Sequence, residues 1–188
     1  MLKWIFVLTL LMMQQACFNV ATTGAQVVYN RRSIQESMND QYITLQVHQA
    51  VNANKKEFSE CNIAITTQHG RVLLVGQVQN HFQKNKMEQM TRRIPNVEEV
   101  YNLLAISNSS STLKRISDVW LTTKVKAKLI ASNDVDATQI KVMTENGTVY
   151  LMGILPKDEA EMAVDIASDT EGVESVVKIF SYLHITKS

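Results

Sequence analysis

The hydrophobic positions of the chain follow the same pattern twice. In each copy, apolar residues four apart come first, then two segments in which apolar residues alternate, then a second helical segment and a final apolar run. In the second copy Leu121, Val125 and Leu129 fall on one face of a helix with 3.6 residues per turn. Residues 140–151 alternate as half-buried strands do. Each copy therefore predicts the order helix, strand, strand, helix, strand.

A short motif shows that the two copies repeat one unit. Gln-His-Gly-Arg-Val-Leu-Leu-Val-Gly at residues 68–76 recurs as Glu-Asn-Gly-Thr-Val-Tyr-Leu-Met-Gly at residues 145–153, a period of about 77 residues. Asn-Gly between alternating segments is typical of a tight hairpin turn. We interpret Gly76 and Gly153 as strand-end glycines where backbone approaches closely. The expected fold is α+β, with two tandem domains, each αββαβ and each with two helices packed on a three-stranded mixed sheet.

Cap and stop residues suggest where the helices of the second copy begin and end. Ser117 or Asp118 is predicted to cap its first helix. Pro156 suits the first turn of its second helix, and Gly172 is placed to end that helix.

The N-terminus carries an apolar segment that lies outside the repeat. After Lys3, residues 4–13 form an apolar core of about ten residues, too short to span a bilayer and typical of a signal peptide. Ala16 then precedes Cys17, and a small residue before a cysteine at this position resembles the lipobox of bacterial lipoproteins. That resemblance implies cleavage before Cys17 and its acylation, with chains such as palmitate. An ordinary secretory signal with an incidental cysteine is the alternative.

Composition and spacing divide the chain into five segments. We predict a signal peptide over residues 1–16, a lipidated N-terminus and flexible tether over 17–40, a first domain over 41–107, a linker over 108–116 and a second domain over 117–188. The linker is short, so the two domains are expected to touch.

The chain has two cysteines, so their pairing has few alternatives. If Cys17 is acylated, Cys61 has no partner and is expected to be a small buried residue before the first strand. A disulfide between Cys17 and Cys61 is the alternative if Cys17 is not acylated.

Composition and charge favour neither a nucleic-acid binder nor an enzyme. The formal net charge is +1, with 45% hydrophobic and 20% charged residues, so no strongly basic face is expected. The acidic run along the second helix of the second copy is interpreted as a solvated face. Nucleophile and phosphate-loop motifs are missing, and no metal site or cofactor is predicted. The histidines are dispersed without further ligands at metal-binding spacing: His48, His69, His81 and His184.

Three motifs together resemble a known family. Residues 71–77, 118–125 and 144–153 are similar to motifs of BON domains, and two such units after a signal peptide and Cys17 resemble the dual BON-domain outer-membrane lipoproteins of Gram-negative bacteria. The resemblance implies a non-enzymatic, periplasm-facing lipoprotein that binds anionic phospholipid through the first helix of its second BON domain. The resemblance implies phosphatidylglycerol and cardiolipin as the lipids and Trp120 as the residue that contacts them. Enrichment at division sites and support of envelope integrity are also implied.

The helical pattern leads to the same face without the family. At about 100° per residue, Trp120 lies about 140° away from the core stripe centred on Val125. A tryptophan with small side chains and cations is typical of a helix that lies among anionic headgroups. The predicted phospholipid-binding residues are Trp120, Thr123, Lys124, Ala127, Lys128, Ile130 and Ala131. Each lysine near such a surface contributes about 1 kcal/mol, so binding should weaken with salt.

Two alternatives remain for Trp120. It could pack against the other domain, or, with Tyr42, it could dock onto an envelope assembly or cell-wall machinery as part of a protein-interaction adaptor. Tyr42 occupies its position in the first copy, but Gln46 and Ala50 replace the two lysines. Lipid binding is therefore expected in the second copy.

Overall fold

The computed structural model describes residues 24–182, with side chains described from residue 35 onward. The chain divides between Gln35 and Glu36 into two compact units, and both copies of the repeat lie in the second unit. The predicted signal peptide and Cys17 lie outside the described residues. Among the described residues, no helix is both long enough and apolar enough to cross a membrane.

The first copy has the predicted order of elements, with its third strand in two pieces. Its elements are α2 (Gly24–Ala53), β1 (Asn62–Gln68), β2 (Arg71–Val78), α3 (His81–Arg92), β3 (Glu99–Asn102) and β4 (Ala105–Ile106). Strand β1 pairs with β2 antiparallel, whereas β3 and β4 pair with β2 in parallel, one after the other. The mixed sheet is therefore confirmed, with its third strand interrupted between Asn102 and Ala105.

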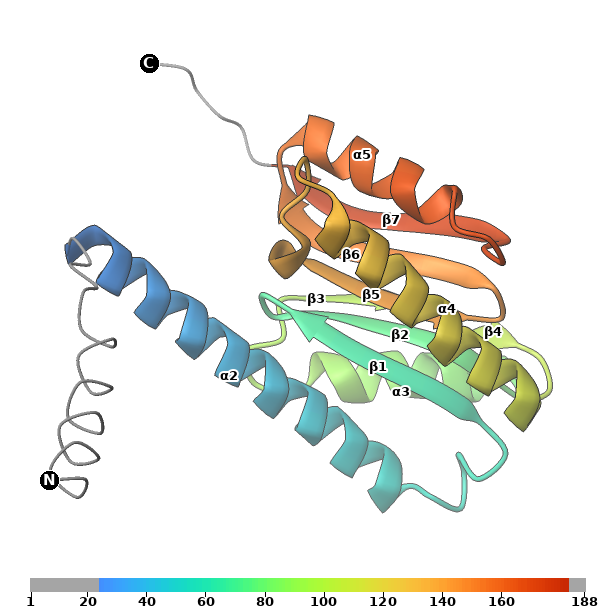
Figure 1. The fold of residues 1–188 in the computed structure, drawn as a ribbon. Helices are drawn as coiled ribbons and strands as arrows, with labels where there is room; N and C mark the ends of the chain where they lie inside the picture. Colours follow the sequence, from blue (N-terminus) through green and yellow to red (C-terminus); the bar gives the residue numbers. More distant parts are fainter. Residues whose placement is uncertain (1–23, 183–188) are drawn as a thin grey trace, which may run out of the picture. The chain divides into compact units, whose positions relative to one another are not determined.

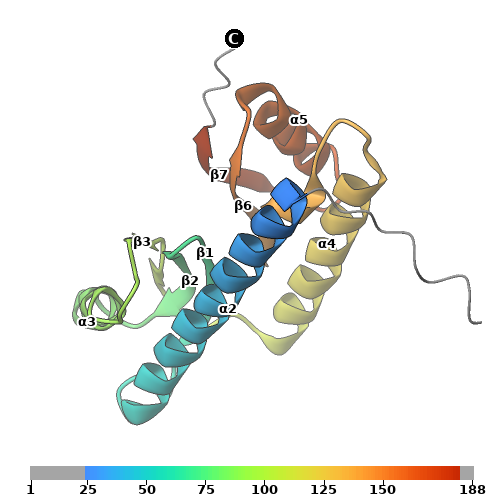
Figure 2. The ribbon, with the colours of Figure 1, turned by 90° about the vertical axis from the view of Figure 1, so that its left-hand side faces the viewer.

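The second copy has the same order with an unbroken third strand. Its elements are α4 (Thr112–Ala131), the short 3₁₀ helix η2 (Ala137–Gln139), β5 (Ile140–Glu145), β6 (Thr148–Leu155), α5 (Lys157–Ser168) and β7 (Ser175–Tyr182). The strand order is β5-β6-β7, with an antiparallel and then a parallel pairing. Helices α4 and α5 lie on one side of this sheet (Figures 1 and 2).

The first helix of each copy begins earlier than the sequence predicted. Helix α4 starts at Thr112, and the Ser111 side chain caps it by accepting a hydrogen bond from the Lys114 backbone N–H. The prediction that Ser117 or Asp118 caps this helix is wrong, because several residues in this stretch have capping side chains and the preference alone does not choose among them. Helix α2 starts at Gly24 and includes residues for which a flexible tether was predicted. No glycine or proline interrupts residues 25–53, so the helix continues although the apolar period is weak.

Asp118 holds the hairpin turn of the second copy instead of capping a helix. It is buried, and its carboxylate accepts hydrogen bonds from the backbone N–H groups of Asn146 and Gly147, both at 2.9 Å. Asn146 and Gly147 have positive φ angles of 51° and 76°, which confirms the predicted turn. In the first copy Asp40 binds the equivalent turn in the same way. The contact between first helix and hairpin is thus part of the repeated unit.

Each copy has its own core, and a third cluster joins the two sheets. The two cores lie between the helices and the sheet and centre on Ile43 and Leu74 in the first copy and on Val125 and Leu151 in the second. The third cluster contains residues of both sheets: Ala64, Leu73, Val75, Tyr101, Met143, Tyr150, Met152, Val177 and Ile179. The helix-free faces of the sheets therefore pack against each other, as the short linker predicted.

Polar residues close one edge of this interface between the sheets. The buried Glu145 carboxylate accepts hydrogen bonds from Asn62 Nδ2 at 3.0 Å and from Gln77 Nε2 at 2.8 Å. Ser110, from the predicted linker, donates its backbone N–H to Gln77 Oε1 at 3.0 Å. These bonds satisfy a carboxylate that would otherwise be costly to bury.

Candidate functional site

The residues predicted to bind phospholipid lie together on the outward face of α4. All seven are exposed: Trp120, Thr123, Lys124, Ala127, Lys128, Ile130 and Ala131. Trp120 exposes 67% of its surface, so it does not pack against the first domain and that alternative is wrong. Its direction follows from the helical period, because Leu121, Val125 and Leu129 turn the opposite face into the core.

Three further apolar residues, which the sequence analysis missed, extend this face. Leu113, Ile116 and Val119 expose 79%, 59% and 68% of their surfaces. They were missed because the helix was predicted to begin at residue 117, although Leu113, Ile116 and Trp120 are already spaced three and four apart. We define the α4 stripe as Leu113, Ile116, Trp120, Thr123, Ala127, Ile130 and Ala131. Val119 lies at its edge.

Two lysines beside the stripe are held in place by α5 and its following turn. Lys124 Nζ donates to the Glu171 carbonyl oxygen at 2.6 Å, and Lys128 Nζ donates to the Asp169 carbonyl oxygen at 2.9 Å. Both carbonyls follow the C-terminus of α5, where the helix dipole favours cations. An ammonium group has three donors, so each lysine keeps donors for an outside acceptor.

All exposed charge on α4 is positive. The helix carries Lys114, Arg115, Lys124, Lys126 and Lys128, and all five are exposed. Its only carboxylate is that of Asp118, which is buried and bound to the hairpin turn. The near-neutral charge of the whole chain therefore conceals a locally basic helix.

The equivalent face of the first copy is apolar and lacks cations. Met38, Tyr42 and Leu45 expose 65%, 48% and 53% of their surfaces along α2. Between residues 36 and 53 the helix has no lysine or arginine. The difference between the copies predicted from the repeat is thus present on the folded surface.

The described residues offer little for metal or thiol chemistry. Among them, no group of three or more His, Cys, Asp and Glu side chains could hold a metal ion. Cys61 is half-buried rather than fully buried, and its Sγ donates to Gln83 Oε1 at 3.5 Å. Burial is the main cause that raises the pKa of this thiol, so the reactive thiolate is disfavoured.

Comparison with known proteins places the chain in one family. The BON domain matches residues 39–108 and residues 117–183. Over 160 residues the chain is 36% identical to "Outer membrane lipoprotein DolP" of Haemophilus influenzae, which covers 85% of this chain and 83% of that protein. It is 30% identical over 152 residues to the "21 kDa hemolysin" of Actinobacillus pleuropneumoniae, covering 81% and 78%. It is 26% identical over 158 residues to "Osmotically-inducible protein Y" of Escherichia coli, covering 82% and 78%.

Proposed function

The chain belongs to the BON-domain family, and on that basis we propose that it is an outer-membrane lipoprotein whose α4 stripe binds anionic phospholipid. The signal-like segment before Cys17 supports an acyl anchor, and similarity to an outer membrane lipoprotein over most of both chains supports the location. One observation carries the lipid binding. Trp120 is exposed within an apolar stripe beside which every exposed charge of the helix is positive.

The stripe fits a helix that lies flat in the membrane interface. Helix α4 has 20 residues, so it is about 30 Å long and offers apolar side chains from Leu113 to Ile130. Burying one large apolar side chain contributes about 1.5–3 kcal/mol. Trp120 lies near the middle of the stripe, where its ring enters the headgroup boundary and its N–H reaches water.

The lysines supply the preference for anionic headgroups. Lys124 and Lys128 each contribute about 1 kcal/mol near an anionic surface. Their bonds to carbonyl oxygens hold them beside the stripe before lipid arrives, so less side-chain entropy is lost on binding. Phosphatidylglycerol and cardiolipin are the proposed ligands, and a neutral membrane should bind much more weakly.

The acyl anchor and the α4 stripe have different roles in this proposal. Three acyl chains on Cys17, at about 0.8 kcal/mol per buried CH₂, hold the protein to the membrane without help from α4. The stripe then sets the orientation of the domains and the choice of lipid, at the high effective concentration that the anchor provides.

A lipid test can use Trp120 itself as the reporter. The chain has two tryptophans, and Trp4 lies in the predicted signal peptide, so in the processed chain Trp120 emits alone. We expect its emission to shift to the blue when the acylated protein is placed in vesicles containing phosphatidylglycerol or cardiolipin, and to shift back in high salt. Emission that is the same in neutral and anionic vesicles would contradict the proposal.

Co-sedimentation with vesicles then separates α4 from the anchor. A chain that begins at Phe18 lacks both the apolar segment of residues 4–13 and the acylated cysteine, and we expect it to sediment with anionic vesicles only. Adding Trp120→Glu should abolish this binding. Adding Tyr42→Glu, at the equivalent position of the first copy, should leave it unchanged.

Envelope integrity and enrichment at division sites belong to the same proposal, and the resemblance to dual BON-domain lipoproteins supports them. A fluorescent fusion of the whole chain tests the second point. Septal enrichment should be lost in Trp120→Glu while the protein stays at the cell periphery.

A protein-interaction adaptor is the second candidate function. The exposed Met38, Tyr42 and Leu45 on α2 favour it, because they form an apolar face without cations. Vesicle binding that ignores headgroup charge, together with loss of envelope function in Tyr42→Glu, would favour the adaptor over the lipid binder.

A further inference from the structure

The outer edge of β7 is an unpaired strand edge. In the order β5-β6-β7, strand β7 pairs with β6 along its whole length, from Ser175 to Tyr182, and the described residues place no strand on its other side. The corresponding strand of the first copy is broken between β3 and β4. An edge of this length presents backbone N–H and C=O groups that another extended chain can pair with.

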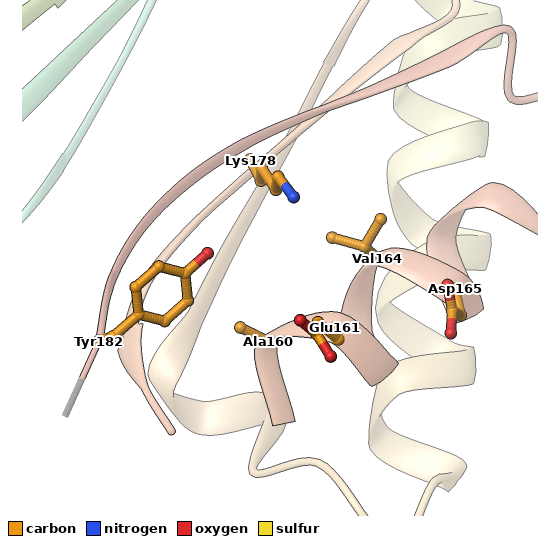
Figure 3. Close-up of a pocket in the computed structure, with 6 residues that line it drawn as sticks. All are labelled: Ala160, Glu161, Val164, Asp165, Lys178 and Tyr182. Carbon is orange, nitrogen blue, oxygen red and sulfur yellow. The ribbon is translucent and has the colours of Figure 1, made fainter. Parts of the chain in front are cut away.

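A pocket opens beside this edge, between β7 and α5. Its volume is about 170 Å³, and its lining residues are Ala160, Glu161, Val164, Asp165, Lys178 and Tyr182. In Figure 3 the Lys178 ammonium and the Tyr182 hydroxyl point into the space above Ala160 and Val164. The floor is thus apolar and the rim polar, which suits a side chain with an apolar stem and a charged end.

In the first copy, hydrogen bonds join the helix and the strand at the equivalent position. Asn102 there occupies the position of Lys178, since each lies two residues after a valine that the repeat aligns, Val100 or Val176. Asn102 Nδ2 donates to the Lys84 carbonyl oxygen at 2.9 Å and to Glu88 Oε2 at 3.2 Å, which ties the strand to α3. Among the described residues, Lys178 makes no such bond to α5. The gap between helix and strand is therefore open in the second copy.

The helices beside the gap also differ in charge, since Asn85 and Gln89 of α3 stand at the positions of Glu161 and Asp165 of α5. Helix α5 and its end expose carboxylates on Asp158, Glu161, Asp165 and Asp169. Successive residues on one face of a strand are about 6.7 Å apart, and residues four apart on a helix rise about 6 Å. Helix α5 runs along β7 in Figure 1, and Glu161 and Asp165 line the pocket beside this strand, so alternate side chains of a strand added to β7 would lie opposite these two carboxylates.

We propose that the open edge of β7 binds an extended, basic segment of a partner protein as an added strand. Alternate lysine or arginine side chains of that segment lie along α5, and one aliphatic stem enters the pocket over Val164. A second copy of this chain fits the edge poorly, because two acidic α5 helices would approach each other. Anionic lipid is repelled by the same carboxylates, so this edge stays accessible while α4 contacts a membrane.

Hydrogen exchange with a defined peptide tests the added strand. The probe is an acetylated, amidated octapeptide that alternates lysine and threonine, mixed with the whole chain in neutral detergent micelles. We expect the peptide to slow amide exchange in β7, at alternate residues between Ser175 and Tyr182, and to leave the amides of β3 unchanged. The same peptide with glutamate in place of lysine should have no effect.

Charge reversal tests the role of α5 against a matched control. The double variant Glu161→Lys with Asp165→Lys should weaken peptide binding about tenfold or more, because it removes two attractive contacts and adds repulsion. Asn85→Lys with Gln89→Lys, at the equivalent positions of α3, should not change it. Circular dichroism and urea denaturation establish that both variants fold.

Three outcomes would overturn the proposal. In the first, the lysine peptide does not slow amide exchange in β7. In the second, the peptide still binds after both charges on α5 are reversed. In the third, β7 becomes protected without peptide as the protein concentration rises, which would indicate pairing between two copies of the chain.

Discussion

Leu113 is a residue whose role depends on where its helix begins. It exposes 79% of its surface at the N-terminal end of the α4 stripe, and nothing in the described part of the chain covers it. If α4 lies flat on a membrane, Leu113 enters the interface together with Trp120. If only the middle of the helix touches lipid, Leu113 stays in water.

We expect Leu113→Glu to reduce affinity for anionic vesicles several-fold, and less than Trp120→Glu does. The change removes an apolar contact of about 1.5–3 kcal/mol and adds a charge that anionic headgroups repel. Co-sedimentation of the chain that begins at Phe18 measures the loss. Leu45→Glu, on the exposed face of α2, is the control and should bind vesicles as strongly as the unsubstituted chain. If Leu113→Glu also binds as strongly as the unsubstituted chain, the lipid contact is confined to the middle of α4.

Gly76 is the glycine that the backbone requires most strictly. Its φ is +118°, and an added Cβ would lie 2.0 Å from the Asn62 carbonyl oxygen. Gly172 also has a positive φ, +97°, but the nearest atoms to an added Cβ are 3.7 Å away. A side chain at Gly172 would meet only the strain of a positive φ, whereas a side chain at Gly76 would also collide with the backbone of Asn62.

Gly76→Ala should lower the free energy of unfolding by about 3 kcal/mol or more, because the methyl group collides with backbone that cannot move aside. Gly172→Ala should cost about 1 kcal/mol, from strain alone. Urea denaturation measures both. Similar losses in the two variants would mean that β1 can shift away from Gly76.

At the scale of elements, two contacts join the first helix of each copy to its hairpin. Asp118 accepts two backbone hydrogen bonds from the turn between β5 and β6, and Thr122 Oγ1 donates to Thr144 Oγ1 at 2.7 Å one turn later. Asp40 and Thr44 repeat both contacts in the first copy. These contacts fix how α4 lies over the sheet and therefore which face it leaves exposed.

Asp118→Asn should lower the free energy of unfolding by about 1.5–3 kcal/mol. An amide has one acceptor oxygen where the carboxylate has two, so one turn N–H loses a charge-assisted bond in a buried place. Urea denaturation measures the loss, and Asp134→Asn, on an exposed residue after α4, should be close to neutral. An unchanged midpoint for Asp118→Asn would show that the turn forms without the carboxylate.

At the scale of the whole molecule, the sheet-to-sheet interface contains two tyrosines with raised pKa values. Burial is the main cause for both; a hydrogen bond to Glu99 adds to it for Tyr101, and the Glu145 charge adds to it for Tyr150. Both pKa values lie above the ordinary value of 10.0. The unfolded chain therefore loses these protons first as pH rises. The contribution of the tyrosines to stability is complete below pH 10 and decreases as pH rises from there through the folded-state values.

We expect the free energy of unfolding to fall as the pH rises above about 10, and to fall less when Tyr101→Phe and Tyr150→Phe are combined. Urea denaturation at several alkaline pH values measures this difference. Tyr182→Phe, outside the interface, is the control. An equal loss in the native chain and the double variant would assign the alkaline loss to other groups.

The sequence predicted the repeated fold because its signals are local. Apolar period, Asn-Gly and the paired glycines depend on near neighbours, so αββαβ and both hairpin turns could be read directly. The start of α4 could not be read from the sequence, because Ser111, Ser117 and Asp118 have similar capping chemistry. In the structure Ser111 caps the helix, and Asp118 instead binds a turn far along the chain.

The same division holds for the candidate site. By itself the sequence determined that Trp120 points away from the core and that the second copy carries the lysines, because both follow from helical geometry and residue identity. The tertiary structure alone decided that Lys124 and Lys128 bind carbonyls beyond α5 and that Asp118 is removed from the surface. These features depend on contacts between segments distant in sequence, which no local pattern encodes.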